Sequence, residues 1–287
     1  MSTILVTGAH GQLGSEIRKI STNFAQFNFV FAGRDEMPLE NKDAIVSFLE
    51  KTKPSCIINA GAYTAVDKAE TERELADQVN HIAVGVIAKW CKLNNTKLIH
   101  ISTDYVFDGN SQIPLDEAAK TAPVNWYGET KLRGEEAILE AMNDAIIIRT
   151  AWVYSEYGNN FVKTMLRLLK ERDRLTVVND QIGAPTYALD LAEAILKIVS
   201  SGKWETGIFH YSNKGKISWF DFAIAIKELA QLECEVVPVP SSQFPTAAKR
   251  PNYSLLDTSK IEKTYGVQIP FWKDSLRKCL FELGVRS

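Results

Sequence analysis

The stretch that decides the fold is Val6-Thr7-Gly8-Ala9-His10-Gly11-Gln12-Leu13-Gly14, near the start of the 287-residue chain. It follows a short apolar run and precedes a helical pattern. Because glycine has no Cβ, such a turn lets the backbone approach a pyrophosphate, whose charge the following helix N-terminus favours. The spacing Gly-x-x-Gly-x-x-Gly differs from the usual Gly-x-Gly-x-x-Gly, and an ordinary glycine turn is the alternative. We interpret Gly8, Gly11 and Gly14 as a dinucleotide-binding turn.

Beyond this turn, strand-like apolar runs alternate with helical patterns. The strand candidates are residues 3–7, 27–32, 55–60, 97–102, 145–149 and 207–212. The helix candidates are residues 41–51, 69–93, 127–142, 161–172 and 187–200. Residues 238–251 carry prolines and are predicted to form a loop. This alternation predicts an α/β fold, a Rossmann-type doubly wound parallel sheet with helices on both faces.

The alternation loosens after residue 150, which predicts a second, smaller part of the molecule. We expect residues 1–150 to form the dinucleotide-binding domain, with residues 187–212 returning to its sheet. Residues 151–186 and 213–287 are expected to form a smaller α/β substrate-binding lobe. It should lie over the carboxyl ends of the strands, where open α/β sheets bind their ligands.

Composition excludes several classes of protein. Hydrophobic residues make up 45% and charged residues 24%, which is ordinary for a globular enzyme. The net charge of −2 argues against a nucleic-acid partner, which usually requires a basic surface. The four cysteines lie too far apart in sequence for a zinc or redox motif, and no metal site is predicted. No apolar run is long enough to span a membrane, so a cytoplasmic location is expected.

A tyrosine and a lysine lie four residues apart in Asn125-Trp126-Tyr127-Gly128-Glu129-Thr130-Lys131. On a helix, this spacing puts both side chains on one face. A phenol normally titrates near ~10, too high for a good acid at neutral pH. We expect the Lys131 ammonium to favour the phenolate and so to lower the pKa of Tyr127. Together with the glycine turn, the pair indicates a nicotinamide-dependent oxidoreductase.

Other candidate residues follow the strands. Thr103 ends the fourth strand and could hydrogen-bond a substrate carbonyl, although a local cap is the alternative. The small residues from Ala60 to Ala62 follow the third strand and would let the chain pass beside a cofactor, or pack a helix tightly. Arg34 follows the second strand and favours NADPH, with a solvated surface arginine as the alternative, and the adjacent Asp35 would suit NADH. His100 is interpreted as a buried core histidine.

These motifs resemble the extended short-chain dehydrogenase/reductase family. The glycine turn, Ser102-Thr103-Asp104 and the Tyr127–Lys131 pair carry the resemblance. Further segments resemble those of its nucleotide-sugar reductases: residues 63–70, 102–109, 149–154, 158–161, 179–186 and 250–251. The family often has an aspartate in a short segment after the second strand. This chain has Pro38-Leu39-Glu40-Asn41 there, so that contact is left open.

The resemblance implies reduction of a 4-keto sugar nucleotide by NADPH, with NADH as the other cofactor. Tyr127 is then the proton donor, Lys131 holds the nicotinamide ribose, and Thr103 contacts the sugar. The residues implied to bind the cofactor are Gly11, Gln12, Leu13, Ala62, Tyr63 and Thr64. Those implied to bind the substrate are Val66, Asp104 and Trp152. Arg250 is expected on a substrate phosphate, with a loop-capping arginine as the equal alternative.

Two other functions stay open at this point. An epimerase of the same superfamily would keep its NAD tightly bound and return the hydride to the sugar. A non-catalytic regulatory subunit would bind the cofactor and a partner enzyme, although the intact Thr103, Tyr127 and Lys131 set argues against this. A homodimer is one assembly that the sequence leaves open.

Overall fold

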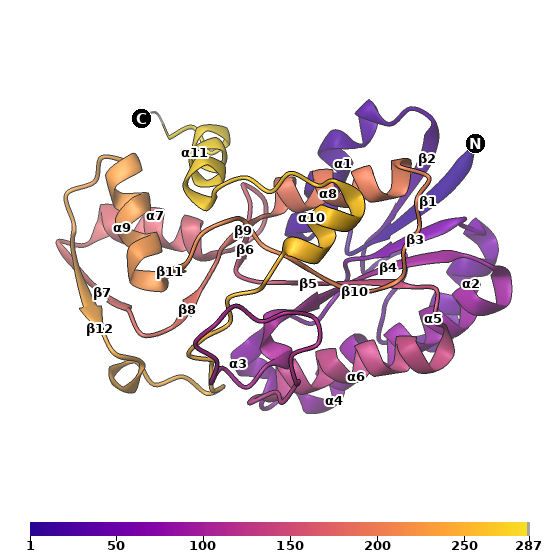
Figure 1. The fold of residues 1–287 in the computed structure, drawn as a ribbon, viewed down its shortest axis with the longest axis horizontal. Coiled ribbons are helices and arrows are strands. Elements are labelled where there is room, and N and C mark those ends of the chain that lie inside the picture. Colours follow the sequence, from indigo (N-terminus) through magenta and orange to yellow (C-terminus); the bar gives the residue numbers. More distant parts are fainter. Residues whose placement is uncertain (286–287) are drawn as a thin grey trace.

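The computed structural model describes residues 1–285, and its elements follow the alternating order that the sequence predicts (Figure 1). The strands are β1 (Ser2–Thr7), β2 (Phe27–Ala32), β3 (Cys56–Asn59), β4 (Lys97–Thr103), β5 (Ile146–Thr150), β6 (Val153–Tyr154), β7 (Arg174–Val178), β8 (Ile182–Gly183), β9 (Thr186–Tyr187), β10 (Gly207–Tyr211), β11 (Ile217–Ser218) and β12 (Glu235–Val239). The helices are α1 (Gln12–Ile20), α2 (Lys42–Thr52), α3 (Val66–Ala69), α4 (Arg73–Asp77), α5 (Ala83–Asn94), α6 (Trp126–Ala141), α7 (Phe161–Glu171), α8 (Ala188–Ser200), α9 (Trp219–Leu229), α10 (Ser259–Tyr265) and α11 (Trp272–Glu282). Short 3-10 segments are η1 (Ser21–Asn23), η3 (Asp104–Val106) and η4 (Ser241–Gln243), and η2 (Gln78–Ile82) is a π-helical turn.

The central feature is a six-stranded sheet in the order β10-β5-β4-β3-β1-β2, with every neighbouring pair parallel. The order of the strands reverses at β1, because β2 lies on one side of it and β3, β4, β5 and β10 follow one another on the other side. A crevice forms at such a reversal, at the carboxyl ends of the strands, and open α/β sheets bind ligands there. The predicted Rossmann-type parallel sheet is confirmed, and β10 pairs with β5 at its edge.

Two hydrophobic layers cover the sheet. One contains buried side chains of α1, α8 and α10, and the other contains those of α2, α5 and α6. Figure 1 shows these two groups of helices on opposite sides of the strands. The strands are apolar on both faces, as expected where helices cover both sides of a parallel sheet.

A third cluster of buried side chains lies beyond the carboxyl ends of the strands. It joins α7, α9 and α11 with β7, and it includes Tyr154, Phe222 and Trp272. In Figure 1 these elements lie at the opposite end of the molecule from β1, β2 and β3. Its aromatic rings stack or pack edge to face, as Tyr154 does with Tyr187 at 5.4 Å between centroids.

The structure departs from the sequence expectations in two regions. The helix expected over residues 69–93 is broken into α3, α4, the π-helical turn η2 and α5. The loop expected over residues 238–251 begins inside a strand, because β12 extends to Val239 and pairs with β7. Pro238 is tolerated because this ladder has two strands, so each of them has a free edge that needs no N–H donor.

Candidate active site

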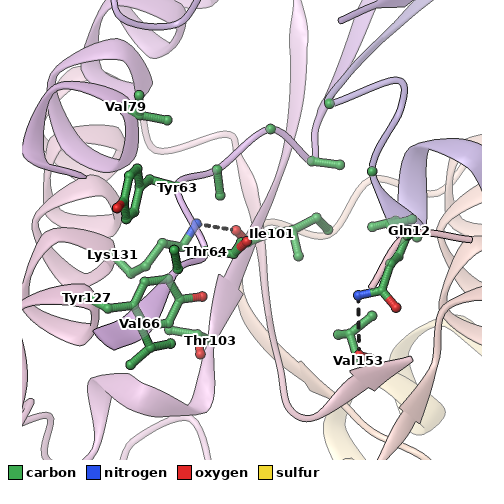
Figure 2. A pocket seen from close by; sticks show the side chains of 18 of the residues that line it. Gln12, Tyr63, Thr64, Val66, Val79, Ile101, Thr103, Tyr127, Lys131 and Val153 are labelled. Carbon is green, nitrogen blue, oxygen red and sulfur yellow. Dashed lines mark hydrogen bonds between the residues drawn. The ribbon is translucent and has the colours of Figure 1, made fainter. Parts of the chain in front are cut away.

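A cavity of about 940 Å³ lies at the carboxyl ends of β1, β3 and β4. Residues that the sequence singled out line it from several elements, and Figure 2 shows ten of the lining residues with labels. The predicted site residues that line it are Gly8, Gly11, Gln12, Leu13, Arg34, Ala60, Ala62, Tyr63, Thr64, Val66, Thr103, Asp104, Tyr127, Lys131 and Trp152. Gly14 and Arg250 are the predicted site residues that do not line it.

The glycine turn is built by close backbone contacts. Gly8 has a φ of +67°, and a Cβ there would lie 2.8 Å from the carbonyl oxygen of Ala60. A Cβ on Gly14 would collide with the carbonyl oxygen of Gly8, so Gly14 packs α1 against the turn and does not face the cavity. Gly11 is the N-cap of α1 and offers no side chain. The first N–H groups of α1 are therefore free to bind an anion.

Tyr127 and Lys131 lie on the cavity face of α6, one turn apart, as predicted. Asn125 begins this helix by accepting a hydrogen bond from Gly128 N at 2.8 Å. The lysine Nζ donates to the carbonyl oxygen of Ile101 at 2.6 Å, which Figure 2 shows as a dashed line. It also lies 3.3 Å from Nε2 of His100. The contacts of the lysine are thus with strand β4.

The expected fall in the pKa of Tyr127 is wrong for this structure. Burial raises the pKa of the phenol to about 12, and a hydrogen bond with Thr103 opposes the rise. Burial also lowers the pKa of Lys131 to about 8, against the favourable charge of Glu135. The prediction considered the charge of the lysine and left out the loss of water around both groups.

Thr103 and Asp104 close the carboxyl end of β4. The Thr103 hydroxyl accepts a hydrogen bond from Tyr105 N at 3.2 Å and donates one to Asp104 Oδ1 at 3.1 Å. Thr103 is therefore the local cap of η3 and a lining residue of the cavity at the same time. Burial raises the pKa of the Asp104 carboxyl to about 6. This carboxyl changes its protonation close to neutral pH.

The far wall of the cavity contains an aromatic stack that the sequence showed only in part. Trp152 has a φ of +48° and stacks on Trp219 with ring centroids 3.7 Å apart. Both rings line the cavity. Trp219 was not predicted, although Ser218 and Asp221 form a capping box that marks the start of α9.

Arg34 lies at the edge of the cavity, next to Gly33 and Glu40. Its guanidinium bonds Oε1 of Glu40 through Nε at 2.9 Å and Nη2 at 2.8 Å. The side chain is 72% exposed, so water screens this pair. Leu39 and Glu40, in the segment left open at the sequence level, also line the cavity.

The structure places Arg250, the residue expected on a substrate phosphate, outside the set that lines the cavity. Its guanidinium pairs with the carboxylate of Asp67 at 3.0 and 2.6 Å and lowers the pKa of that carboxyl. The sequence could not show this pair, because its members are 183 residues apart. Close by, Asn125 donates to the carbonyl oxygen of Lys249 at 2.7 Å. The segment around residues 248–250 thus braces both α3 and the start of α6.

A buried ion pair links the helix that carries Tyr127 and Lys131 to the central sheet. Glu135 of α6 accepts hydrogen bonds from Arg149 of β5, at 2.9 and 3.2 Å from Nε and 2.6 Å from Nη2. Ser102 of β4 donates to the same carboxylate at 2.5 Å. The side chains of the pair are 1% and 3% exposed. This cluster joins two strands of the sheet to the helix that carries Tyr127 and Lys131.

Neither a metal-binding cluster nor a membrane-spanning helix occurs among residues 1–285. Histidine, cysteine, aspartate and glutamate side chains form no group of three or more that could hold a metal ion in this part of the chain. Among the same residues, no helix combines the length and the apolar character needed to cross a membrane.

The whole described chain matches one family model, that of the RmlD substrate binding domain, over residues 1–285. A dTDP-4-dehydrorhamnose reductase of Aggregatibacter actinomycetemcomitans is 41% identical over an alignment of 287 positions, which covers 96% of this chain and 98% of the relative. The chain belongs to the dTDP-4-dehydrorhamnose reductase family. The predicted resemblance and the predicted oxidoreductase class are therefore confirmed.

Solved structures of dTDP-4-dehydrorhamnose reductases share the fold over their whole length. The one from Clostridium acetobutylicum is 39% identical, with a TM-score of 0.94 over 98% of this chain and 99% of that chain. The one from Bacillus anthracis, in complex with NADP, is 38% identical, with a TM-score of 0.93 over 98% of this chain and 100% of that chain. This neighbour agrees with the predicted nicotinamide cofactor.

Proposed function

We propose that this member of the dTDP-4-dehydrorhamnose reductase family reduces the C4 keto group of dTDP-4-dehydro-L-rhamnose to give dTDP-L-rhamnose, the last step of dTDP-rhamnose synthesis. NADPH is the proposed cofactor, and NADH is the second choice. One observation carries the proposal: Tyr127, Lys131 and Thr103 line the same cavity as the glycine turn. The reductase activity for which the relatives are named, and the NADP bound to one of them, support it.

The residues present fit a dinucleotide. Gly8 and Gly11 line the cavity beside the first turn of α1, whose N–H groups favour a pyrophosphate. Gln12 and Leu13 would lie along the diphosphate, and the chain from Ala60 to Thr64 would line the cofactor. When bound, NADPH supplies the hydride that the C4 carbon accepts.

Tyr127 is the proposed proton donor to the C4 oxygen. Its high pKa keeps the phenol protonated at neutral pH, so that the proton is present when the alkoxide forms. Thr103 is proposed to hydrogen-bond the same oxygen and Lys131 to offset the charge left on the phenol. Val66, Asp104 and Trp152 are proposed to contact the sugar nucleotide. Arg250 would act indirectly, by holding Asp67 next to Val66.

We also propose which parts of the chain bind the cofactor and which bind the substrate. Residues 1–150, with residues 187–212, would bind the cofactor, and residues 151–186 and 213–287 would bind the substrate. The proposal needs no nucleic-acid partner, and a homodimer is compatible with it. A cytoplasmic location is proposed because the four cysteines are free and buried, which suits a reducing compartment.

The proposed function is tested by mixing purified protein with NADPH and dTDP-4-dehydro-L-rhamnose. We expect loss of reduced nicotinamide absorbance in proportion to dTDP-L-rhamnose formed, with the C4 configuration read by NMR. Protein that carries one equivalent of bound NAD and interconverts sugars without net oxidation would indicate the epimerase alternative. Cofactor binding without turnover would indicate the regulatory subunit.

Arg34→Ala should raise KM for NADPH more than KM for NADH. A charged hydrogen bond to the 2′-phosphate is worth at most about 1.5–3 kcal/mol. Exposure of Arg34 and its pairing with Glu40 reduce this value, so we expect roughly a tenfold rise for NADPH. Steady-state kinetics with both cofactors measures the two KM values.

Arg167→Ala is a matched control, since Arg167 is an exposed arginine paired with Glu171 at 2.8 Å. Equal effects on both cofactors would assign Arg34 to the surface only.

Trp152→Ala should lower kcat/KM for the keto sugar by roughly tenfold or more while NADPH affinity changes little. The indole forms an apolar wall of the cavity by stacking on Trp219. Trp152→Phe, which keeps a ring on Trp219, should retain more activity than Trp152→Ala. Kinetics and fluorescence titration measure these values.

If Trp152 belonged to the core, its replacement by alanine would instead lower the stability of the protein by about 3–5 kcal/mol. Such a loss, with normal kcat/KM in the folded fraction, would assign Trp152 to the core.

A further inference from the structure

A row of buried polar side chains crosses three neighbouring strands beneath the cavity. Thr7 of β1 is in register with Asn59 of β3, and Asn59 is in register with His100 of β4. Each of these side chains is at most 1% exposed. Buried polar groups are costly unless they are hydrogen-bonded, so this row must satisfy its own donors and acceptors.

The atoms that face one another along the row give each hydrogen bond its direction. Gly61 N can only donate, and it lies 3.0 Å from the Thr7 hydroxyl, which therefore accepts. The Thr7 hydroxyl then donates to Asn59 Oδ1 at 2.7 Å. This orients the Asn59 amide, so that its Nδ2 donates to His100 Nδ1 at 3.0 Å.

His100 is consequently held in one tautomer. Burial lowers the pKa of His100 well below its usual value, so the ring is neutral. A neutral ring that accepts at Nδ1 carries its proton on Nε2. That Nε2 lies 3.3 Å from Nζ of Lys131. An ammonium has donors and no acceptor, whereas an amine has a lone pair that can accept this proton.

We propose that His100 is a positioning residue of the reduction site, which presents its Nε2–H to Lys131 and so favours release of a lysine proton toward Tyr127. This inference rests on the proposed function. Tyr127 gives its proton to the C4 alkoxide and becomes a phenolate. The Lys131 ammonium gives one proton to restore the phenol, and its nitrogen becomes an amine that accepts from His100. Solvent returns the proton to the amine when product leaves.

The charged groups around Lys131 divide into two sets. On its own helix, the Glu135 carboxylate favours the ammonium, and Tyr127 lies one turn away. Arg149 of β5 pairs with that carboxylate and weakens this effect. From β4, His100 presents an N–H and Ile101 a carbonyl oxygen. His100 is thus the group on the strand side that favours the amine form.

The tautomer can be measured without any assay of activity. Protein labelled with 15N in its histidine rings should show His100 with Nε2 protonated and Nδ1 unprotonated from about pH 6 to 9. His210 is an internal control, because its Nδ1 bonds the carbonyl oxygen of Leu115 at 3.0 Å and must carry the proton. The two buried histidines are therefore expected in opposite tautomers. His100→Gln and His210→Gln assign the signals. A His100 ring protonated on Nδ1 would overturn the inference.

A pH profile of kcat then tests the effect on catalysis. Reduction needs a protonated donor, so kcat should fall as pH rises through the pKa of the Tyr127–Lys131 pair. In His100→Gln, the amide oxygen can accept from the ammonium, and this alkaline limb should move up by roughly one pH unit. KM for NADPH should stay within about twofold. His210→Gln should leave the limb where it is.

The outcomes separate the inference from the function on which it rests. Wild-type protein that fails to reduce the keto sugar contradicts the proposed function, whatever the histidine spectrum shows. Active wild-type protein whose alkaline limb is the same in His100→Gln contradicts the inference alone. Equal displacement of the limb in His100→Gln and His210→Gln also contradicts it, because a general change in packing would then be the cause.

Discussion

Tyr127→Phe is expected to lower kcat by ~10²–10⁴-fold, the usual contribution of a general acid. The phenyl ring keeps the edge-on contact with Tyr105, whose ring centroid lies 5.5 Å away, so the fold should be retained. The change removes the hydroxyl of the proposed proton donor and little else. Steady-state kinetics gives kcat, and fluorescence titration should show nearly normal NADPH affinity.

A tyrosine remote from the cavity provides the control for this change. Tyr265 is buried, and its hydroxyl donates to the carbonyl oxygen of Glu205 at 2.6 Å. Tyr265→Phe removes a bonded hydroxyl and should cost about 1 kcal/mol of stability without loss of kcat. If Tyr127→Phe retained more than about a tenth of wild-type kcat, another group would have to donate the proton.

Glu135→Gln is expected to lower the free energy of unfolding by about 3–5 kcal/mol, because it leaves the Arg149 guanidinium buried without a counter-charge. The pair is almost fully buried and bonded at 2.6 Å, so water cannot replace the lost partner. Denaturant unfolding followed by circular dichroism measures the change. The result should appear as a lower midpoint with a similar slope.

The control for Glu135 is an exposed ion pair on another helix. Glu171 pairs with Arg167 at 2.8 Å, and both side chains are more than half exposed. Glu171→Gln should change stability by at most about 0.5 kcal/mol. Similar losses in Glu135→Gln and Glu171→Gln would mean that the buried pair contributes no more than a surface pair.

The central sheet could be predicted because its signals are local. Each strand from β1 to β5 is a short apolar run followed by a turn or a helical pattern, and the glycine turn fixes the first crossover. The β7–β12 pair could not be predicted in this way. Its strands are far apart in sequence, and Pro238 in β12 indicates a loop to any local rule. The π-helical turn η2 likewise lacks a local marker.

The site was predictable where a motif carried it. Tyr127, Lys131 and Thr103 line one cavity because parallel strands and their following helices end at the same edge of the sheet. The residues that sequence reasoning missed act through contacts between elements, as Glu135 of α6 does with Arg149 of β5. The pKa of Tyr127 was misjudged for the same reason, since burial is set by the whole fold and not by the neighbouring lysine.

The bracing of α6 and α3 by residues 248–250 has a consequence for synthesis of the chain on the ribosome. Domains generally begin to fold from the N-terminus while translation proceeds at about 5–20 residues per second. The sheet could form early, but Asn125 lacks its partner until Lys249 has been made, and Asp67 lacks Arg250. The start of α6 would therefore be completed late, and we expect nascent chains truncated before residue 248 to be inactive even if their sheet is formed.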